Sequence, residues 1–252
     1  MNFNNNLQLF KNHYDKNGWV LLKNFVTVEK VNQIKLIIRD YIEDQIKKIN
    51  NPRKLNFTDN QLNIKSLNSF HDLGNNKQIK RISNSKKIKD IVKFFLNSEP
   101  EYRQSELFAK PKKNGLPSPD HQDNYYWAVK GSNALTIWVA LDISNKENGA
   151  VHYYDGSHKF GIMDHKASYA KGSSQTIKNR SHLKKFNKSQ PSLDIGDALI
   201  HNCLVVHGSS ANKSNKSRQG WTIQFKDKKA KYDLKQKKIY EESLTKQIKK
   251  RS

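Results

Sequence analysis

The sequence predicts a mostly β protein, a sandwich or barrel with helices packed against its outside. The later part of the chain is a series of short apolar runs separated by turn residues, such as 130–133 and 155–157. The earlier part instead carries apolar residues at helical spacing. The 252 residues fit a single domain. Within it we expect helical support over 1–100, a barrel core over 101–226 and a basic C-terminal helix over 227–252.

The first part of the chain contains one strand and two helices with clear patterns. An apolar run after Gly18 predicts a strand over 18–22. Thr27 can cap a helix that the spacing predicts over about 28–48. Its apolar face consists of Val31, Ile34, Ile37, Ile38, Tyr41 and Ile42. A second helix is predicted near 86–97, and residues 50–66 have no clear period.

Seven or more short apolar runs follow, and each is a candidate strand. They are 106–109, 125–129, 134–141, 150–154, 198–200, 204–206 and 221–225. The polar, lysine-rich segment 159–192 interrupts this pattern, and a loop of that length is typical of a lid or a binding segment. Near the C-terminus, apolar residues at four-residue spacing predict a helix with one apolar stripe. Its basic face is most simply a solvated face, and membrane or nucleic-acid binding is the alternative.

Composition excludes several protein classes. The chain has 46 Lys+Arg against 23 Asp+Glu, a net charge of +23, and its 11 Phe, 10 Tyr and 4 Trp suffice for a core. No run approaches the roughly 18 apolar residues of a membrane span. The N-terminus lacks the pattern of a secretion signal, so we expect a cytoplasmic protein. The single cysteine, Cys203, excludes an internal disulfide and a multi-cysteine zinc site, and its apolar surroundings predict a buried thiol.

The positive charge does not by itself predict nucleic-acid binding. The excess is mostly lysine, in a chain also rich in asparagine and isoleucine. The sequence contains no arginine-rich cluster, no RNA-binding aromatic motif and no helix-turn-helix pattern. Nucleic acid is therefore not expected to be the main partner.

Four residues in order along the barrel part could build a metal site. In a strand, residues i and i+2 point to one face, so His121 and Asp123 would project side by side. His207 closes a distant apolar run, and Arg218 precedes another. Two histidines and one carboxylate on one face of a metal leave positions open, which suits Fe(II), and an arginine can clamp a carboxylate. Alone, the tripeptide is more typical of a surface histidine beside a loop aspartate than of a metal site.

From about Tyr14 to Phe225 the chain resembles the phytanoyl-CoA dioxygenase family of Fe(II)/2-oxoglutarate oxygenases. The matching segments are Asn17–Phe25, Leu107–Pro111, His121–Asp123, Ala134–Asp142, Glu147–Gly149, Gly156–Lys159, Gly196–Ile200 and His207–Arg218. Each segment is short, and their order and spacing together carry the resemblance. It implies a double-stranded β-helix, a jelly-roll barrel with the metal inside.

The resemblance also implies roles for individual residues. His121, Asp123 and His207 would hold Fe(II), while Arg218 would bind the distal carboxylate of 2-oxoglutarate beside Ser209. The other residues expected at the cosubstrate are Trp138, Thr136, Gln104 and Lys65, and those expected at the substrate are Tyr125, Tyr126 and His165. No catalytic residue is expected beyond the metal ligands. We also expect His201 to support the site.

The expected function is hydroxylation of a small organic substrate, with 2-oxoglutarate and O₂ converted to succinate and CO₂. The carboxylate of Asp123 favours hydroxylation, because halogenating relatives have a small residue at that position. The basic residues at 159–188 indicate an anionic substrate. Two other classes stay open: a non-catalytic β-barrel binding protein, and a basic nucleic-acid-associated protein or demethylase. The substrate's identity and the oligomeric state are not set by the sequence.

Overall fold

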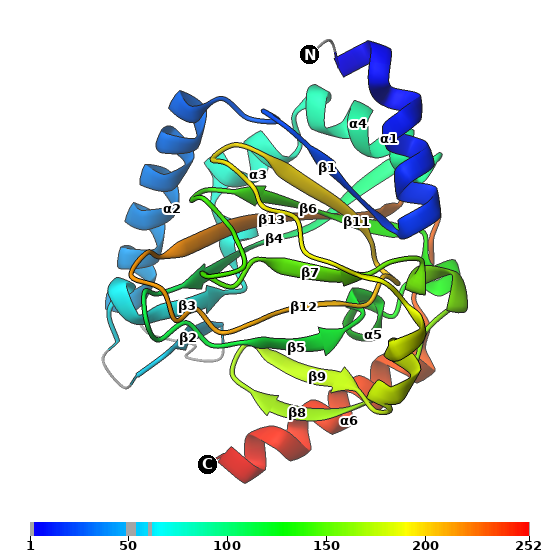
Figure 1. Ribbon diagram of the computed structural model, residues 1–252. Helices are drawn as coiled ribbons and strands as arrows, with labels where there is room; N and C mark the ends of the chain where they lie inside the picture. Colours follow the sequence, from blue (N-terminus) through cyan, green and yellow to red (C-terminus); the bar gives the residue numbers. More distant parts are fainter. Residues whose placement is uncertain (1–2, 49–53, 60–61, 252) are drawn as a thin grey trace.

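The computed structural model describes residues 3–48, 54–59 and 62–251, and its centre is a pair of facing antiparallel sheets (Figure 1). The larger sheet has the strand order β1-β11-β6-β13-β4-β3-β2, and the smaller sheet has the order β10-β7-β12-β5. A separate hairpin, β8-β9, lies beside β5. This arrangement is the predicted jelly-roll barrel with flanking helices.

The strands are β1 (Trp19–Leu22), β2 (Leu55–Phe57), β3 (Leu67–Phe70), β4 (Pro100–Lys110), β5 (Ser118–His121), β6 (Ala134–Ala140), β7 (Val151–Tyr154), β8 (His165–Ala170), β9 (Ser173–Ile177), β10 (Lys188–Ser189), β11 (Ala198–Asn202), β12 (His207–Ser209) and β13 (Arg218–Asp227). The helices are α1 (Phe3–Asn17), α2 (Val28–Lys48), α3 (Lys77–Ser83), α4 (Lys86–Leu96), α5 (Asp123–Trp127) and α6 (Leu234–Arg251). Short 3-10 turns are η1 (Ile64–Ser66), η2 (Leu73–Asn75), η3 (Lys130–Ser132), η4 (Ser157–Phe160) and η5 (Arg180–Lys185).

Alternation along the central strands decides which side chains face the cavity. In β13, the odd-numbered Trp221, Ile223 and Phe225 belong to the large apolar cluster shared with α1 to α4. The even-numbered Arg218, Thr222 and Gln224 point to the other face and line a cavity between the sheets. The larger sheet therefore packs on helices with one face and builds the site with the other.

Most of the predicted elements are confirmed, with bounds that differ by a few residues. The strand predicted over 18–22 is β1, and the predicted helices are α2 and α4. Cys203 is buried, as predicted. The irregular segment predicted over 50–66 lies partly outside the described residues, and its described part contains β2 and η1.

Three predicted elements are wrong in type. The apolar run 204–206, expected to be a strand, is a turn between β11 and β12. The apolar run 125–129, expected to be a strand, is largely the short helix α5, which ends where Ala128 takes a left-handed φ of 53°. The segment 159–192, expected to be a loop, contains the hairpin β8-β9 and the turn η5. Its polar residues gave no strand alternation because they hydrogen-bond to neighbouring elements instead of packing an apolar face. Helices α1 and α3 were not predicted.

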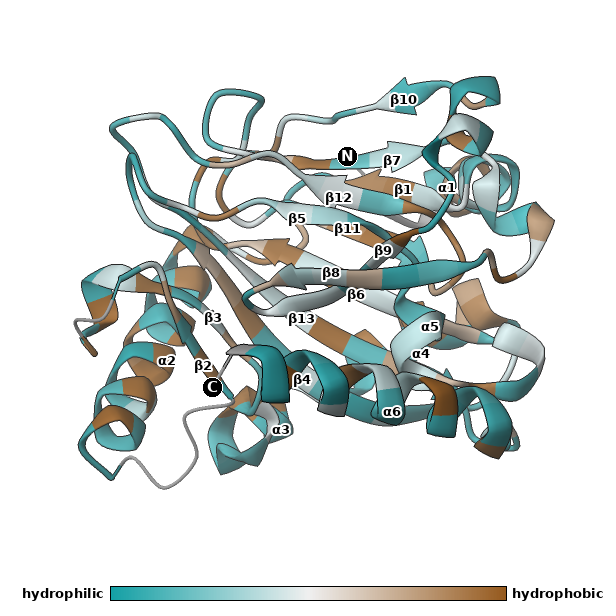
Figure 2. Ribbon diagram, turned by 90° about the horizontal axis from the view of Figure 1, so that it is seen from below, coloured by the Kyte–Doolittle hydropathy of each residue, from teal (hydrophilic) through white to brown (hydrophobic). Residues whose placement is uncertain are grey.

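The C-terminal helix α6 lies across the hairpin and α5, on the side of the barrel away from α1 (Figure 1). Figure 2 shows mostly hydrophilic residues along α6, in contrast to the brown bands on the central strands. Among the described residues, no helix is long and apolar enough to span a membrane.

Candidate metal centre

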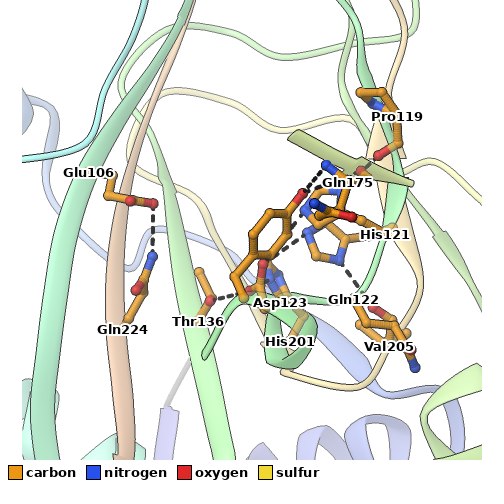
Figure 3. A network of polar contacts seen from close by, with 12 residues as sticks. Glu106, Pro119, His121, Gln122, Asp123, Thr136, Gln175, His201, Val205 and Gln224 are labelled. Atoms are coloured by element: carbon orange, nitrogen blue, oxygen red, sulfur yellow. Dashed lines mark hydrogen bonds and ion pairs between the residues drawn. The ribbon is translucent and has the colours of Figure 1, made fainter. Parts of the chain in front are cut away.

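Three side chains converge where two strands of the smaller sheet end. His121 is the last residue of β5, Asp123 begins α5, and His207 begins β12, directly opposite His121 in the strand register. One ligand atom from each lies within 4.8 Å of the others. Nε2 of His121 is 3.7 Å from Oδ1 of Asp123 (Figure 3). Nε2 of His207 is 3.6 Å from the same oxygen. The predicted triad therefore meets around one point.

The two imidazole rings are held with Nε2 facing that point. Nδ1 of His121 lies 2.7 Å from the carbonyl oxygen of Pro119, and Nδ1 of His207 lies 3.1 Å from that of Val205. A ring that donates its Nδ1 proton to a carbonyl keeps the lone pair on Nε2 for a metal. Burial lowers the pKa of His207, and the neighbouring His121 lowers it further, so this ring is neutral.

The carboxylate of Asp123 is oriented by two partners at its other oxygen. Thr136 donates its hydroxyl to Oδ2 at 2.7 Å, and His201 lies 3.2 Å from the same atom through Nε2. Tyr153 contacts the opposite nitrogen of His201 at 3.0 Å. Burial alone would raise the pKa of Asp123, but the surrounding histidines outweigh it and place that pKa well below its usual range. Oδ1 of an ionised carboxylate is therefore left for a metal, and the expected support from His201 is confirmed.

A buried arginine stands at another part of the same cavity. Arg218 is 1% exposed, donates from Nη2 to the carbonyl of Gly149, and lies with its guanidinium carbon 5.2 Å from the ring centre of Trp138. Its Nε is buried without a hydrogen-bond partner among the described residues. Burial lowers the pKa of Arg218 to about 9. A guanidinium with an unused donor can receive a carboxylate.

Several predicted cosubstrate residues line this cavity, which has a volume of about 60 Å³. Ser209, Trp138 and Thr136 border it together with Arg218 and the triad. The ring of Trp138 lies over Gly220, where an added Cβ would be 1.9 Å from the indole. Only glycine leaves room for the indole at this position.

Gln104 and Lys65 lie elsewhere. The side-chain nitrogen of Gln104 donates to the carbonyl of His71 at 2.8 Å, outside the cavity lining. A bulge in the β4–β13 ladder between Gln224 and Phe225 displaces this part of β4. Lys65 lines a different hollow, between α2 and the other face of the larger sheet. Neither position is at the cavity that holds Arg218.

The residues predicted at the substrate surround the triad without lining the cavity. The ring of Tyr126 meets that of His121 edge-on, with centres 5.5 Å apart. Tyr125 stacks on His165 at 4.1 Å. Nε2 of His165 accepts the backbone N–H of Gln122 at 3.1 Å, which ties β8 to the chain between the two metal-binding positions.

Sequence reasoning missed several cavity residues, among them Glu106, Phe108, Thr222 and Gln224. Oε2 of Glu106 accepts from Gln224 at 2.8 Å (Figure 3). Its Oε1 lies 3.0 Å from Nδ1 of His71. The alternation that starts at Arg218 would have placed Thr222 and Gln224 on the cavity face. Nothing in the sequence marked Glu106.

Known proteins resemble both the sequence and the fold. The family model for phytanoyl-CoA dioxygenase matches residues 14–220. A phytanoyl-CoA dioxygenase domain-containing protein 1 homolog of Caenorhabditis briggsae is 24% identical over 86% of this chain and 90% of the relative. A probable alpha-ketoglutarate-dependent hypophosphite dioxygenase of Stutzerimonas stutzeri is 27% identical over 54% of this chain and 48% of its own length.

Two solved structures illustrate the shared fold. EctD from S. alaskensis with bound Fe has a TM-score of 0.72 at 19% identity, over 88% of this chain and 77% of that chain. The epimerase SnoN in complex with Fe3+, alpha ketoglutarate and nogalamycin RO has a TM-score of 0.71 at 17% identity, over 91% and 86%. Because the family model covers most of the sequence, this chain belongs to the phytanoyl-CoA dioxygenase family and is a 2-oxoglutarate-dependent dioxygenase that uses iron and O₂.

Proposed function

We propose that the protein hydroxylates a small organic substrate and releases succinate and CO₂ from 2-oxoglutarate. The observation that carries this proposal is the shared cavity: two imidazole nitrogens and one carboxylate oxygen converge there, and an arginine with an unused donor lies beside them. This donor set suits a ferrous ion with open positions. The non-catalytic barrel and the nucleic-acid-associated protein have no support in the family match.

Each side chain has a separate task in this proposal. His121, Asp123 and His207 would hold the iron, and Arg218 would anchor the distal carboxylate of 2-oxoglutarate beside Ser209. When bound, the iron supplies the redox chemistry that couples O₂ to oxidation of the cosubstrate and the substrate. Asp123 supports hydroxylation over halogenation, since its carboxylate takes the ligand position that a halide would need.

An anionic substrate is the finer part of the proposal, and its support does not come from the basic segment that first indicated it. Lys166, Lys171 and Arg180 are exposed. The guanidinium of Arg180 reaches Asp120 at 2.8 Å, next to His121 in β5 but outside the cavity lining. A different arginine, treated below, lies closer to the triad.

Succinate release tests the proposal directly. Purified protein is assayed with Fe(II), ascorbate and 2-oxoglutarate, with and without a substrate panel, and mass spectrometry searches for a product that gains one oxygen atom. We expect His121→Ala and Asp123→Ala to abolish iron-dependent turnover, because each removes a ligand. Arg218→Ala should raise KM for 2-oxoglutarate by about 10-fold or more, since a charge-assisted pair is lost.

Arg39→Ala is the matched control for the arginine variant, because Arg39 lies on α2 and pairs with exposed Asp40. It should behave as the wild type. Equal turnover in the wild type and both ligand variants would overturn the proposed metal site.

A further inference from the structure

A second arginine in the barrel has the same unusual environment as Arg218. The guanidinium carbon of Arg103 lies 4.7 Å from the ring centre of Trp127, much as that of Arg218 lies over Trp138. The Nε of Arg103 is also buried without a hydrogen-bond partner among the described residues. Two arginines therefore have an unused buried donor, and the proposed cosubstrate accounts for one of them.

The strand register places Arg103 just outside the cavity lining, beside Gln224 at the opposite end of the cavity wall from Arg218. Arg218 pairs with Lys110 at one end of the β4–β13 ladder, and Gln224 pairs with Gln104 near the other. Six residues separate the two ends, a distance of about 20 Å along a strand. Arg103 is the extra residue of the β4 bulge. Its Nη1 donates to Oε1 of Gln224 at 2.7 Å.

That end of the wall adjoins the metal triad. Gln224 lies opposite Thr136 in the β13–β6 register, and Thr136 is the residue that orients Asp123. Arg218 and Arg103 thus lie on the two sides of the position where the metal would bind. A cosubstrate and a substrate that react at one metal must bind at different places around it. Arginines on two sides of the metal position could each bind one of the two molecules.

Arg103 has no carboxylate partner among the described residues. Glu106, the nearby acid, is engaged by His71 at 3.0 Å and by Gln224 at 2.8 Å, and Arg103 makes no ion pair within 4.0 Å. Burial lowers the pKa of Arg103, while the charges of Glu106 and Asp123 act in the other direction. Arg103 is half-buried, and its polar partner Gln224 carries no charge, so an incoming anion at its unused Nε would be favoured.

Helix α6 covers this part of the site. The ring of Tyr240 meets Tyr126 edge-on at 5.3 Å, and Tyr126 in turn meets His121 at 5.5 Å. Burial raises the pKa of Tyr240, Glu106 raises it further and Arg103 lowers it, which is consistent with Tyr240 lying near both charges. Residues 234–251 lie outside the segment 14–220 that the family model matches.

We propose that Arg103 binds an anionic group of the substrate, a carboxylate or a phosphate, beneath Tyr240 of α6. This assignment rests on the proposed function, because it presumes that Arg218 is taken by 2-oxoglutarate. It names Arg103 as the specificity-determining residue for an acidic substrate.

Anion binding to the loaded protein tests the assignment. The protein is saturated with Fe(II) and 2-oxoglutarate without oxygen, and inorganic phosphate and acetate are titrated in separate calorimetric experiments. We expect a single site for at least one of these probes, weakened by about 10-fold or more in Arg103→Met and partly retained in Arg103→Lys. Arg39→Met removes an arginine on the far side of the larger sheet and should bind the probe as the wild type does.

The outcomes separate the alternatives. Stronger binding of phosphate than of acetate would identify a phosphate group, and the reverse a carboxylate. Equal binding in the wild type and Arg103→Met, or absence of binding in the wild type, would overturn the assignment. So would a 10-fold loss of 2-oxoglutarate affinity in Arg103→Met, because Arg103 would then belong to the cosubstrate site.

Two further measurements separate a loss of anion binding from misfolding and from an error in the proposed function. Arg103→Met removes the donor to Oε1 of Gln224, so its melting temperature should fall by only a few degrees and the variant should stay folded during the titrations. If Arg218→Met keeps full 2-oxoglutarate affinity, the proposed role of Arg218 in binding the cosubstrate is wrong. The titration with phosphate or acetate still tests Arg103 in that case, because it compares Arg103→Met with Arg39→Met.

Discussion

The barrel has two covers of opposite character. The apolar cover consists of α1 to α4 on the larger sheet, where Val31, Ile34 and Val92 are fully buried in one continuous cluster. The polar cover consists of the β8-β9 hairpin and α6. The buried positions of α6 include Gln247, 1% exposed, while Leu234 is 75% exposed.

Hydrogen bonds hold the polar cover in place. Gln175 donates to Ser243 at 2.9 Å, and the backbone N–H of Tyr169 reaches Gln247 at 3.2 Å. Each such bond contributes about 1 kcal/mol, less than the burial of one large aliphatic side chain. The comparison indicates that the apolar cover supports the fold, whereas the polar cover can separate from the barrel beside the metal site.

The largest expected difference comes from one substitution made in both covers. Ile34→Ala, at a fully buried position, should lower the free energy of unfolding by about 2–5 kcal/mol, because it leaves a cavity. Ile239→Ala on α6, where the residue is 53% exposed, should change it by less than about 0.5 kcal/mol. Urea denaturation measures both values. Similar losses would remove the distinction between the covers.

Acid should loosen the polar cover through His165. Burial lowers the pKa of His165 to about 4, from 6.5, so the folded protein favours the neutral ring. A proton on Nε2 would displace the N–H of Gln122 that this nitrogen accepts. The stabilisation is complete above pH 6.5 and is lost as the pH falls towards 4.

Between about pH 7.5 and pH 5, linkage predicts a loss of about 2 kcal/mol from this residue. His165→Gln keeps an acceptor without the titration and should flatten that part of the pH profile of urea unfolding. An unchanged profile in the variant would contradict the assignment of this pH dependence to His165.

Removal of α6 should cost less stability than Ile34→Ala. A chain that ends after Asp233 should lose about 1–2 kcal/mol of unfolding free energy, since a few polar contacts disappear. Amide exchange in β8 and β9 should become about 10-fold faster, while exchange in β6 stays the same. Hydrogen exchange with mass spectrometry reads both regions. Unchanged exchange in the hairpin would show that α6 does not hold it.

The sequence alone predicted the apolar cover better than the polar one. Helix α2 was predicted because apolar side chains at every third or fourth position must face a core. The hairpin β8-β9 was missed, since its residues bond to side chains from α5 and α6 and leave no periodic apolar pattern. Periodic spacing of apolar residues predicts which faces are buried. It does not predict elements that are held in place by hydrogen bonds between polar side chains.

At the site, the order of His121, Asp123, His207 and Arg218 was readable from the sequence, and the structure brings these residues to one cavity. Alternation is a local property of a strand, so the sequence also determined that Thr222 and Gln224 share a face of β13 with Arg218. Asp123 nevertheless lies at a helix start rather than within a strand.

Only the tertiary structure decided the surroundings of the triad. The pairing of His201 with Asp123 joins residues 78 positions apart, and the approach of α6 to Tyr126 joins residues 114 positions apart (240 − 126). Arg103 meets Gln224 only because the bulge turns it towards the cavity. Contacts of this kind depend on which elements pack together, and local residue patterns do not predict that packing.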